Sequence, residues 1–190
     1  MPKYQMVNEK LLQVEISNEE VLAKRGAMMR TVTSENMGLM RATGRGTVLY
    51  ARNGLHIHLL QLTGETLYIE SQSVLAFDNR VRTGTYFQGN SGGVGGLVRG
   101  AATGQGLWTT TLEGQGDIAI LSLGEVIALP VTSAKPVHVD PNAYIGHKGN
   151  LQSQIVTDVG WKTLMGQGSG ESFQLKFSGE GTLYVQPSER

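Results

Sequence analysis

Two stretches of the sequence carry the same pattern, and this repeat limits the folds that the chain can adopt. Residues 108–120 (WTTTLEGQGDIAI) and 173–185 (FQLKFSGEGTLYV) each place an aromatic residue six positions before a Gly-x-Gly pair. Alternating apolar residues follow the pair in both copies, and alternation with period two is typical of a β-strand. Glycine permits the backbone conformations that tight turns need. We therefore predict that each copy is a strand, a glycine turn and a second strand.

The composition favours short strands and excludes several classes of protein. Of 190 residues, 26 are glycine and only 17% are charged, as expected for strands joined by tight turns. The chain has no cysteine, which excludes disulfides, thiol nucleophiles and thiolate metal sites. Sixteen basic residues balance sixteen acidic ones, so we expect no nucleic-acid partner. No apolar run approaches the roughly 18 residues of a membrane span, and we expect a cytoplasmic protein with at most peripheral membrane contact.

Local signals along the chain predict an all-β fold. Residues 47–60 form the clearest hairpin, because Asn53-Gly54 supplies the positive φ angles of a type I′ turn. Residues 19–29 are the one short helix candidate, which Gly26 interrupts. The expected fold class is an antiparallel β-sandwich, or double-stranded β-helix-like lobes with internal repeats.

The chain is expected to form a single compact unit over residues 1–190, in which two lobes can be distinguished. These lobes would span residues 1–90 and 91–190, joined by the glycine-rich run 84–106. This run is either a flexible linker or a packed segment in which backbones approach closely. It contains the glycine pair Gly95-Gly96, which we take as part of a candidate interaction surface.

Three motifs suggest chemistry, and each fails on spacing or context. Ser91 lies in a Gly-Asn-Ser-Gly-Gly run like that of trypsin-like proteases, with His56 or His58 as base and Asp78 as orienting acid, but the chain between base and serine is too short for that fold. His56-x-His58 is a cupin-like ligand pair that lacks the acidic residue expected shortly after it. Residues 114–119 fit a loose dinucleotide fingerprint but lie between strands, without a helix to receive phosphate. We therefore predict no catalytic, cofactor-binding or metal-binding residues.

Longer runs of the sequence resemble a known family. They are 95–99 (GGLVR), 104–116 (GQGLWTTTLEGQG), 136–146 (PVHVDPNAYIG) and 168–188 (GSGESFQLKFSGEGTLYVQPS). Together they resemble signatures of the mitochondrial-biogenesis family named for Altered Inheritance of Mitochondria protein twenty-four. The resemblance implies a fold similar to the tryptophan RNA-binding attenuation protein, and a trimer. It implies no catalytic residues, and RNA binding does not transfer with the fold.

The leading functional hypothesis is a non-enzymatic β-rich protein that self-associates, most simply as a trimer, and acts as an assembly or interaction module with a protein partner still to be identified. The alternative is a small-ligand or carbohydrate-binding module that uses the glycine-rich loops and Trp108. Open strand edges and zero net charge favour self-association, because such edges must be covered, charged or paired. The candidate interaction residues are Trp108, Phe173, Gly95, Gly96, Gly114, Gly116, Gly179 and Gly181.

Overall fold

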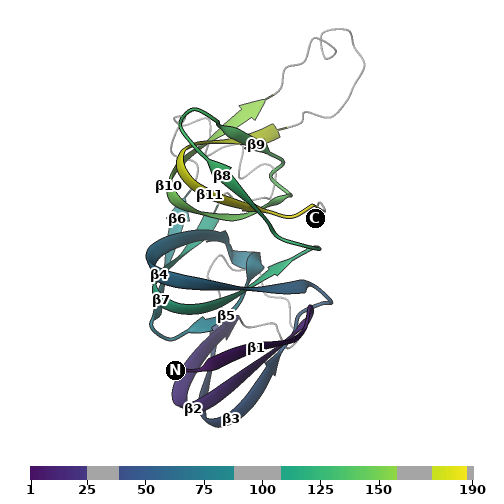
Figure 1. Cartoon of the computed structure of the whole chain (residues 1–190), viewed down its shortest axis with the longest axis vertical. Coiled ribbons are helices and arrows are strands. Elements are labelled where there is room, and N and C mark those ends of the chain that lie inside the picture. The colour runs from purple at the N-terminus through teal and green to yellow at the C-terminus, as the bar shows by residue number, and fades with distance from the viewer. Residues whose placement is uncertain (25–38, 88–107, 158–172, 188–190) are drawn as a thin grey trace.

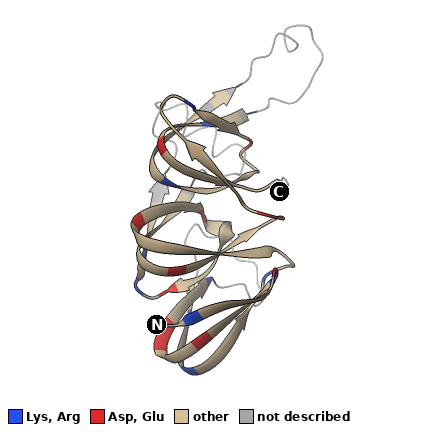
Figure 2. Cartoon of the chain, viewed as in Figure 1, with Lys and Arg blue, Asp and Glu red and all other residues tan. Residues whose placement is uncertain are grey.

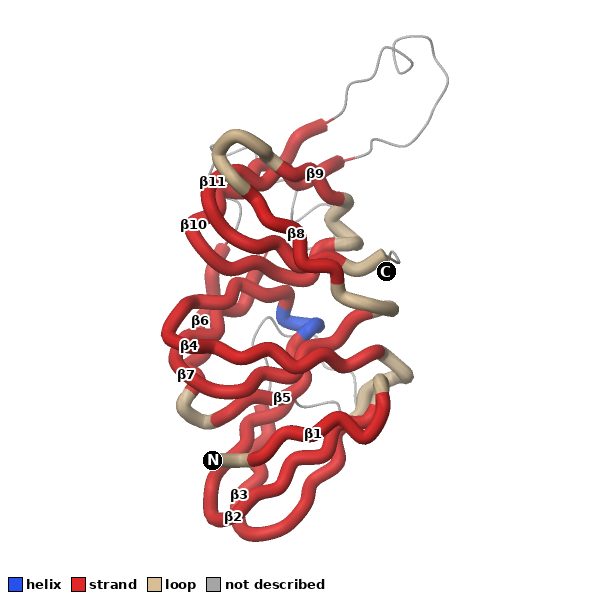
Figure 3. The backbone as a smooth tube through the Cα atoms, in the orientation of Figure 1, coloured by secondary structure: helices blue, strands red, loops and turns tan. Residues whose placement is uncertain are grey.

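The computed structural model describes residues 1–24, 39–87, 108–157 and 173–187, and these form an elongated antiparallel β structure (Figure 1). The all-β prediction is confirmed: the described helical content is the three-residue 3-10 turn η1 (Ser71–Ser73), and strands dominate the backbone trace (Figure 3). The strands are β1 (Lys3–Asn8), β2 (Leu11–Lys24), β3 (Leu39–Tyr50), β4 (His56–Glu70), β5 (Val74–Asp78), β6 (Val81–Phe87), β7 (Trp108–Ser122), β8 (Ile127–Val131), β9 (Val137–Val139), β10 (Tyr144–Thr157) and β11 (Phe173–Val185).

Three layers follow one another along the long axis of the molecule (Figure 1). Each layer is built on one long antiparallel pair: β2 with β3, β4 with β7, and β10 with β11. Short strands complete the layers, because β1 pairs with β2, β5 and β6 pair with β7, and β8 and β9 pair with β11. The layers are joined where β5 also pairs with β2, and where β4 pairs with β10.

The core is divided in the same way as the sheet. The first apolar cluster joins the first layer to Ile57 and Leu121 of the second, the other two clusters lie mainly in the second and third layers, and the first and second clusters meet at the β5 strand, whose five residues are all buried. The second and third layers meet where Ile145 of β10 and Tyr184 of β11 join the second cluster. The largest fully buried side chains are Phe77, Phe177, Leu12, Leu67, Ile69, Leu75, Leu112, Ile118, Ile120, Leu121, Ile145 and Leu183.

The two Gly-x-Gly pairs do not form hairpin turns, so this part of the sequence prediction is wrong. Gly114 and Gly116 lie inside β7, and Gly179 and Gly181 lie inside β11, with continuous strand on both sides. The strands bend there instead of ending. Gly114 and Gly179 have φ angles of 127° and 115°, which other residues rarely adopt.

A third Gly-x-Gly pair, Gly44 and Gly46, lies inside β3 of the first layer. The partner strand shifts register near the pair in both of the first two layers, between Ser17 and Glu20 of β2 and between Thr63 and Thr66 of β4. Such irregularities bend a strand and increase its twist. Each layer therefore owes its curvature to glycines in the middle of long strands.

The turn predicted at Asn53-Gly54 is confirmed, but the hairpin is wrong, because β3 pairs with β2 and β4 pairs with β7 and β10 instead of with each other. Both residues have positive φ angles, 48° and 69°, and the Leu55 amide donates to the Arg52 carbonyl over 2.9 Å. The helix candidate over residues 19–29 is wrong for its first part, since residues 19–24 belong to β2. Val21 and Ala23 are fully buried there, so packing of alternate side chains outweighs helix propensity. Residues 25–29 lie outside the described residues.

Strand pairing crosses the proposed lobe boundary. β7 follows the run 84–106 in sequence, yet it pairs with β4, β5 and β6, which precede that run. Phe87 and Trp108, the described residues on either side of the gap, pair with each other. The division into lobes at 1–90 and 91–190 stays a prediction, and the choice between linker and packed segment concerns residues outside the described ranges.

Candidate functional site

The predicted interaction residues do not converge on one place. Trp108 begins β7 in the second layer, whereas Phe173 begins β11 in the third layer, opposite Thr157. The four described glycines bend these two strands. Gly95 and Gly96 lie outside the described residues. The polar groups that the structure does bring together lie at the two junctions between layers.

The first junction holds a buried carboxylate in a tight turn. Asp78 ends β5 with 1% of its surface exposed, and it accepts hydrogen bonds from the Arg80 backbone amide (3.0 Å), Nε (2.9 Å) and a terminal guanidinium nitrogen (2.8 Å). Burial alone would raise the pKa of Asp78, but these bonds and the positive charge of Arg80 outweigh it and lower the pKa. Asp78 is therefore charged at neutral pH, and Arg80 is its partner.

Asp117 on β7 faces the same junction without such a partner. Burial raises the pKa of Asp117, and the nearby Asp78 carboxylate raises it further, while Arg80 opposes the shift only in part. Two tyrosines complete the cluster. The hydroxyls of Tyr4 on β1 and Tyr50 on β3 are buried and have no hydrogen-bond partner among the described residues. Burial raises the pKa of both phenols, and Asp78 and Asp117 add to the effect at Tyr4.

The second junction is aromatic and centres on His147 of β10. Its ring stacks on Tyr68 of β4, with ring centres 4.8 Å apart and planes within 8°, and a tilted contact to Phe177 follows at 5.4 Å. The Tyr144 hydroxyl lies 2.8 Å from Nδ1. Burial lowers the pKa of His147 to about 4, so the ring is neutral at pH 7. A neutral ring that accepts a hydrogen bond at Nδ1 carries its proton on Nε2.

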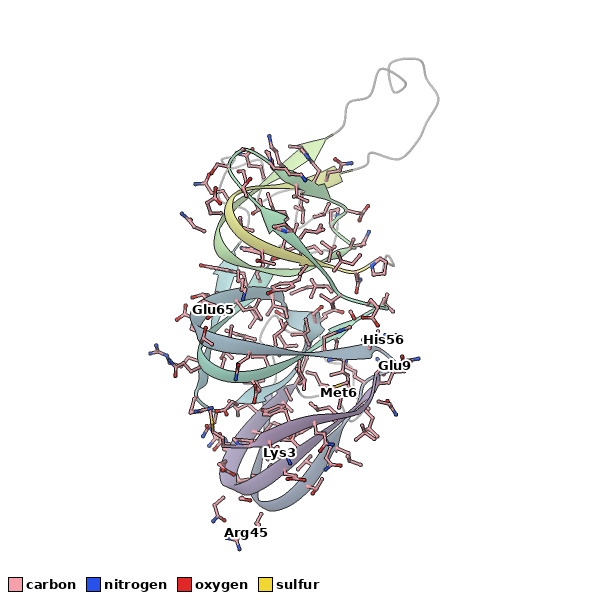
Figure 4. All side chains as sticks on the ribbon, in the orientation of Figure 1. Lys3, Met6, Glu9, Arg45, His56 and Glu65 are labelled. Atoms are coloured by element: carbon pink, nitrogen blue, oxygen red, sulfur yellow. The ribbon has the colours of Figure 1, made fainter. Side chains whose placement is uncertain are left out.

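The two histidines of the His56-x-His58 motif have separate partners. His58 Nε2 lies 2.9 Å from the Ser122 hydroxyl oxygen, and that hydroxyl donates to the Gly124 carbonyl over 2.5 Å. His56 Nε2 lies 3.8 Å from a Glu9 carboxylate oxygen, and these two residues lie at the same edge of the molecule (Figure 4). Within the described ranges, no group of three or more His, Asp or Glu side chains is placed to hold a metal ion.

The protease interpretation gains no support from these positions. Ser91 lies outside the described residues, Asp78 is engaged by Arg80 instead of orienting a histidine, and His58 contacts Ser122. Ser122 is fully buried, so its hydroxyl has no access to a substrate. The Ser122–His58 contact instead ties the end of β7 to the start of β4.

Acidic side chains stabilise the bends of the strands. Glu65 accepts hydrogen bonds from the Thr63 amide (2.9 Å) and hydroxyl (2.8 Å) at the bulge of β4, and Lys148 lies 3.4 Å away across the layer junction. Hydrogen bonds from its own amide and from Thr63 lower the pKa of Glu65 to about 2. Glu19 accepts from the Ser17 amide at the matching bulge of β2. Glu65 and Glu19 thus play the same role at matching bulges of the second and first layers.

Charged residues are scattered over the strands (Figure 2), and several apolar side chains are exposed. Outside the junctions, Val7 on β1 is 52% exposed, Leu49 on β3 58%, Leu59 on β4 37% and Ile127 on β8 44%. All four lie on strands, where flat contact with another surface is geometrically simple. Among the described residues, no helix has the length and apolar character needed to cross a membrane.

Sequence reasoning missed both junction clusters, because their members come from distant strands. Tyr4, Tyr50 and Asp117 share no local pattern with Asp78, and Tyr68 lies far from His147 in sequence. One signal was available: Asp78-Asn79-Arg80 joins two apolar segments, as expected for a turn in which an aspartate accepts from the backbone two residues on.

Comparison with known proteins supports the fold and assigns the family. A crystal structure of a protein from Streptococcus pyogenes matches with a TM-score of 0.71 and 18% sequence identity, covering 100% of this chain and 94% of that one. This likeness bears on the fold alone. No curated protein matches the sequence. The family model described as "Mitochondrial biogenesis AIM24" matches residues 4–188, nearly the whole chain, and the protein therefore belongs to this family.

Proposed function

We propose that this protein is a non-enzymatic β module that associates with copies of itself and serves in assembly or in interaction with other proteins. Membership of the family links the chain to mitochondrial biogenesis. The observation that carries the proposal is the contrast between the interior and the surface. Titratable groups are paired or buried at the layer junctions, whereas apolar side chains of β1, β3, β4 and β8 face outward.

The interior polar groups suit structural roles better than catalytic ones. Active sites collect perturbed titratable groups where a substrate can reach them. Here His147 is 3% exposed and Asp78 1%, and their partners are neighbouring side chains. The stack of His147 on Tyr68, which joins β10 to β4, supports a scaffold role.

The surface favours contact between copies. The chain has no net charge to keep copies apart, and exposed strand residues such as Leu59 and Ile127 lose contact with water when two surfaces meet. Removing apolar area from water yields about 25 cal/mol per Å². Closed rotational symmetry covers such surfaces without open-ended growth. The choice of three copies rests on the family resemblance, and the cytoplasmic location stays a prediction from composition.

Sedimentation velocity at micromolar concentration tests the proposal. We expect one species with three times the mass of the 20.5 kDa chain. Leu59→Glu and Ile127→Glu should shift the distribution toward the single chain, because each places a charge where an apolar contact is expected. Gln115→Glu, at an exposed position of β7, serves as the matched control. A wild-type protein that sediments only as a 20.5 kDa species refutes self-association, and a species of twice that mass refutes the threefold number.

A further inference from the structure

The three layers differ at the outer edge of their second long strand. In the second layer this strand is β7, and β5 and β6 pair with the edge that β4 leaves free. In the third layer it is β11, and β8 and β9 cover the corresponding edge. In the first layer it is β3, which pairs with β2 along its length and with no other described strand.

The surroundings of the glycines in β3 and β7 show the same difference between the two layers. A Cβ atom at Gly114 would lie 2.6 Å from the Arg80 carbonyl oxygen, and one at Gly116 would lie 2.7 Å from the Asp78 side chain. These neighbours belong to the segment that covers the edge of β7. The matching positions in β3, Gly44 and Gly46, have no described atom within 4 Å of a built Cβ. As far as the described residues go, the bend of β3 is thus open where the bend of β7 is covered.

The exposed side chains of β3 are basic and β-forming. Alternate residues along the strand point to solvent: Arg41, Thr43, Arg45, Thr47 and Leu49. The strand contains no acidic residue. Arg41 pairs with Glu20 over 2.9 Å, while Arg45 has no carboxylate partner among the described residues and projects from the end of the molecule (Figure 4).

Other open edges in the described part of the chain are shorter or blocked. β8 has five residues and contains Pro130, which lacks the amide hydrogen that a new strand would need. β1 has six residues, whereas β3 has 12. Long edges without protection add strands from other chains.

We propose that the free edge of β3 binds an extended acidic segment of a partner protein, which adds to the sheet as a further strand. A carboxylate of that segment pairs with Arg45, and an apolar side chain packs on Leu49. A second copy of β3 is a poorer occupant, because two paired β3 strands would align four arginines without an acidic residue between them. The proposal extends the proposed interaction role and does not depend on self-association.

A fluorescein-labelled ten-residue peptide that alternates valine and glutamate is the probe. Its binding to the full chain is followed by fluorescence anisotropy, together with hydrogen–deuterium exchange of residues 39–50. We expect saturable binding, slower exchange in β3, and at least a tenfold loss of affinity in Arg45→Glu. Lys135→Glu makes the same charge change at an exposed turn of the third layer, and its affinity for the peptide should stay within twofold of that of wild type. Replacing the valines by prolines should abolish binding, since proline cannot complete the ladder.

Three results would overturn the proposal. The first is equal binding of a peptide with lysine in place of glutamate, and the second is unchanged affinity in Arg45→Glu with an unaltered urea midpoint. The third is protection of β3 that rises with protein concentration and disappears in Arg45→Glu, because it would show that another copy occupies the edge. A wild-type protein that sediments as a single chain would refute self-association while leaving the peptide measurements interpretable.

Discussion

His147 makes the stability of this protein sensitive to mild acid. The ring is enclosed by Tyr68, Tyr144 and Phe177, with 3% of the residue exposed. The pKa of His147 in the folded protein is about 4, whereas the ordinary value for a histidine is 6.5. The folded state therefore excludes a proton that the unfolded chain binds. Stability from this residue is complete above pH 6.5 and is lost as the pH falls from 6.5 toward 4.

The size of the effect follows from the difference in pKa. One pKa unit corresponds to about 1.4 kcal/mol, so a shift from 6.5 to about 4 has a limit of about 3.4 kcal/mol. Between pH 7 and pH 5 the unfolded chain becomes almost fully protonated at this residue, and the folded state remains neutral. The free energy of unfolding should fall by about 2 kcal/mol over that interval through His147 alone.

Urea unfolding at fixed protein concentration, repeated at pH 7, 6 and 5, measures this slope. His147→Gln is the test variant, because glutamine is neutral throughout and its carbonyl oxygen can accept from the Tyr144 hydroxyl. The variant should be less stable at pH 7, through loss of the stack on Tyr68, and should lose about 2 kcal/mol less than wild type on going to pH 5. His138→Gln, at an exposed position of β9, serves as the matched control. Parallel pH profiles for wild type and His147→Gln would refute the reasoning.

Three further predictions concern the bends and the first junction. Gly114→Ala should destabilise by about 1–3 kcal/mol more than Gly44→Ala, because the φ angles are similar (127° and 114°) and only Gly114 has a carbonyl within 2.6 Å of the new methyl group; equal urea midpoints would contradict this. Asp117→Asn should raise the urea midpoint at pH 7 and Asp78→Asn should lower it, since the first carboxylate is half-buried beside Asp78 with no hydrogen-bond partner among the described residues and the second is held by Arg80; shifts of the same sign would count against the assignment. Glu65→Gln should cost about 1 kcal/mol at pH 7, and the difference from wild type should vanish as the pH falls from 4.5 toward 2, where Glu65 itself becomes protonated; a difference that persists in acid would show that the carboxylate charge is not the cause.

The sequence predicted the all-β fold class, but it predicted turns at positions where the strands only bend. The signals that it used were local ones. The turn at Asn53-Gly54 was predictable because Asn and Gly accept positive φ angles, but the strands on either side of it pair with other strands and form no hairpin. Gly114 and Gly116 read as a turn for the same reason, yet the partner strand β4 follows β7 through the bend, and only the pairing of distant residues keeps the strand continuous. The Gly-x-Gly pair Gly44 and Gly46 was not predicted as a third copy of the repeat, because no aromatic residue lies six positions before Gly44 as one does in the other two copies.

The candidate sites were harder to predict than the strands, since they depend on how the layers stack. Alternation of apolar residues fixes which face of a strand is buried, but a slip of two residues leaves that face unchanged. Apolar contact alone therefore leaves the alignment of one layer on the next weakly specified. One contact between layers removes this freedom at the second junction, where the ring of His147 on β10 stacks on Tyr68 of β4. At the first junction, Tyr4 of β1 lies near Asp78 of β5 and Asp117 of β7. Slipping the second junction by one pair would break the stack of His147 on Tyr68, at a cost of about 0.5–1.5 kcal/mol. A chain with few charges thus places its most deeply buried titratable groups at the junctions between layers, and we propose that its exposed apolar strand residues and the β3 edge serve contact with other chains.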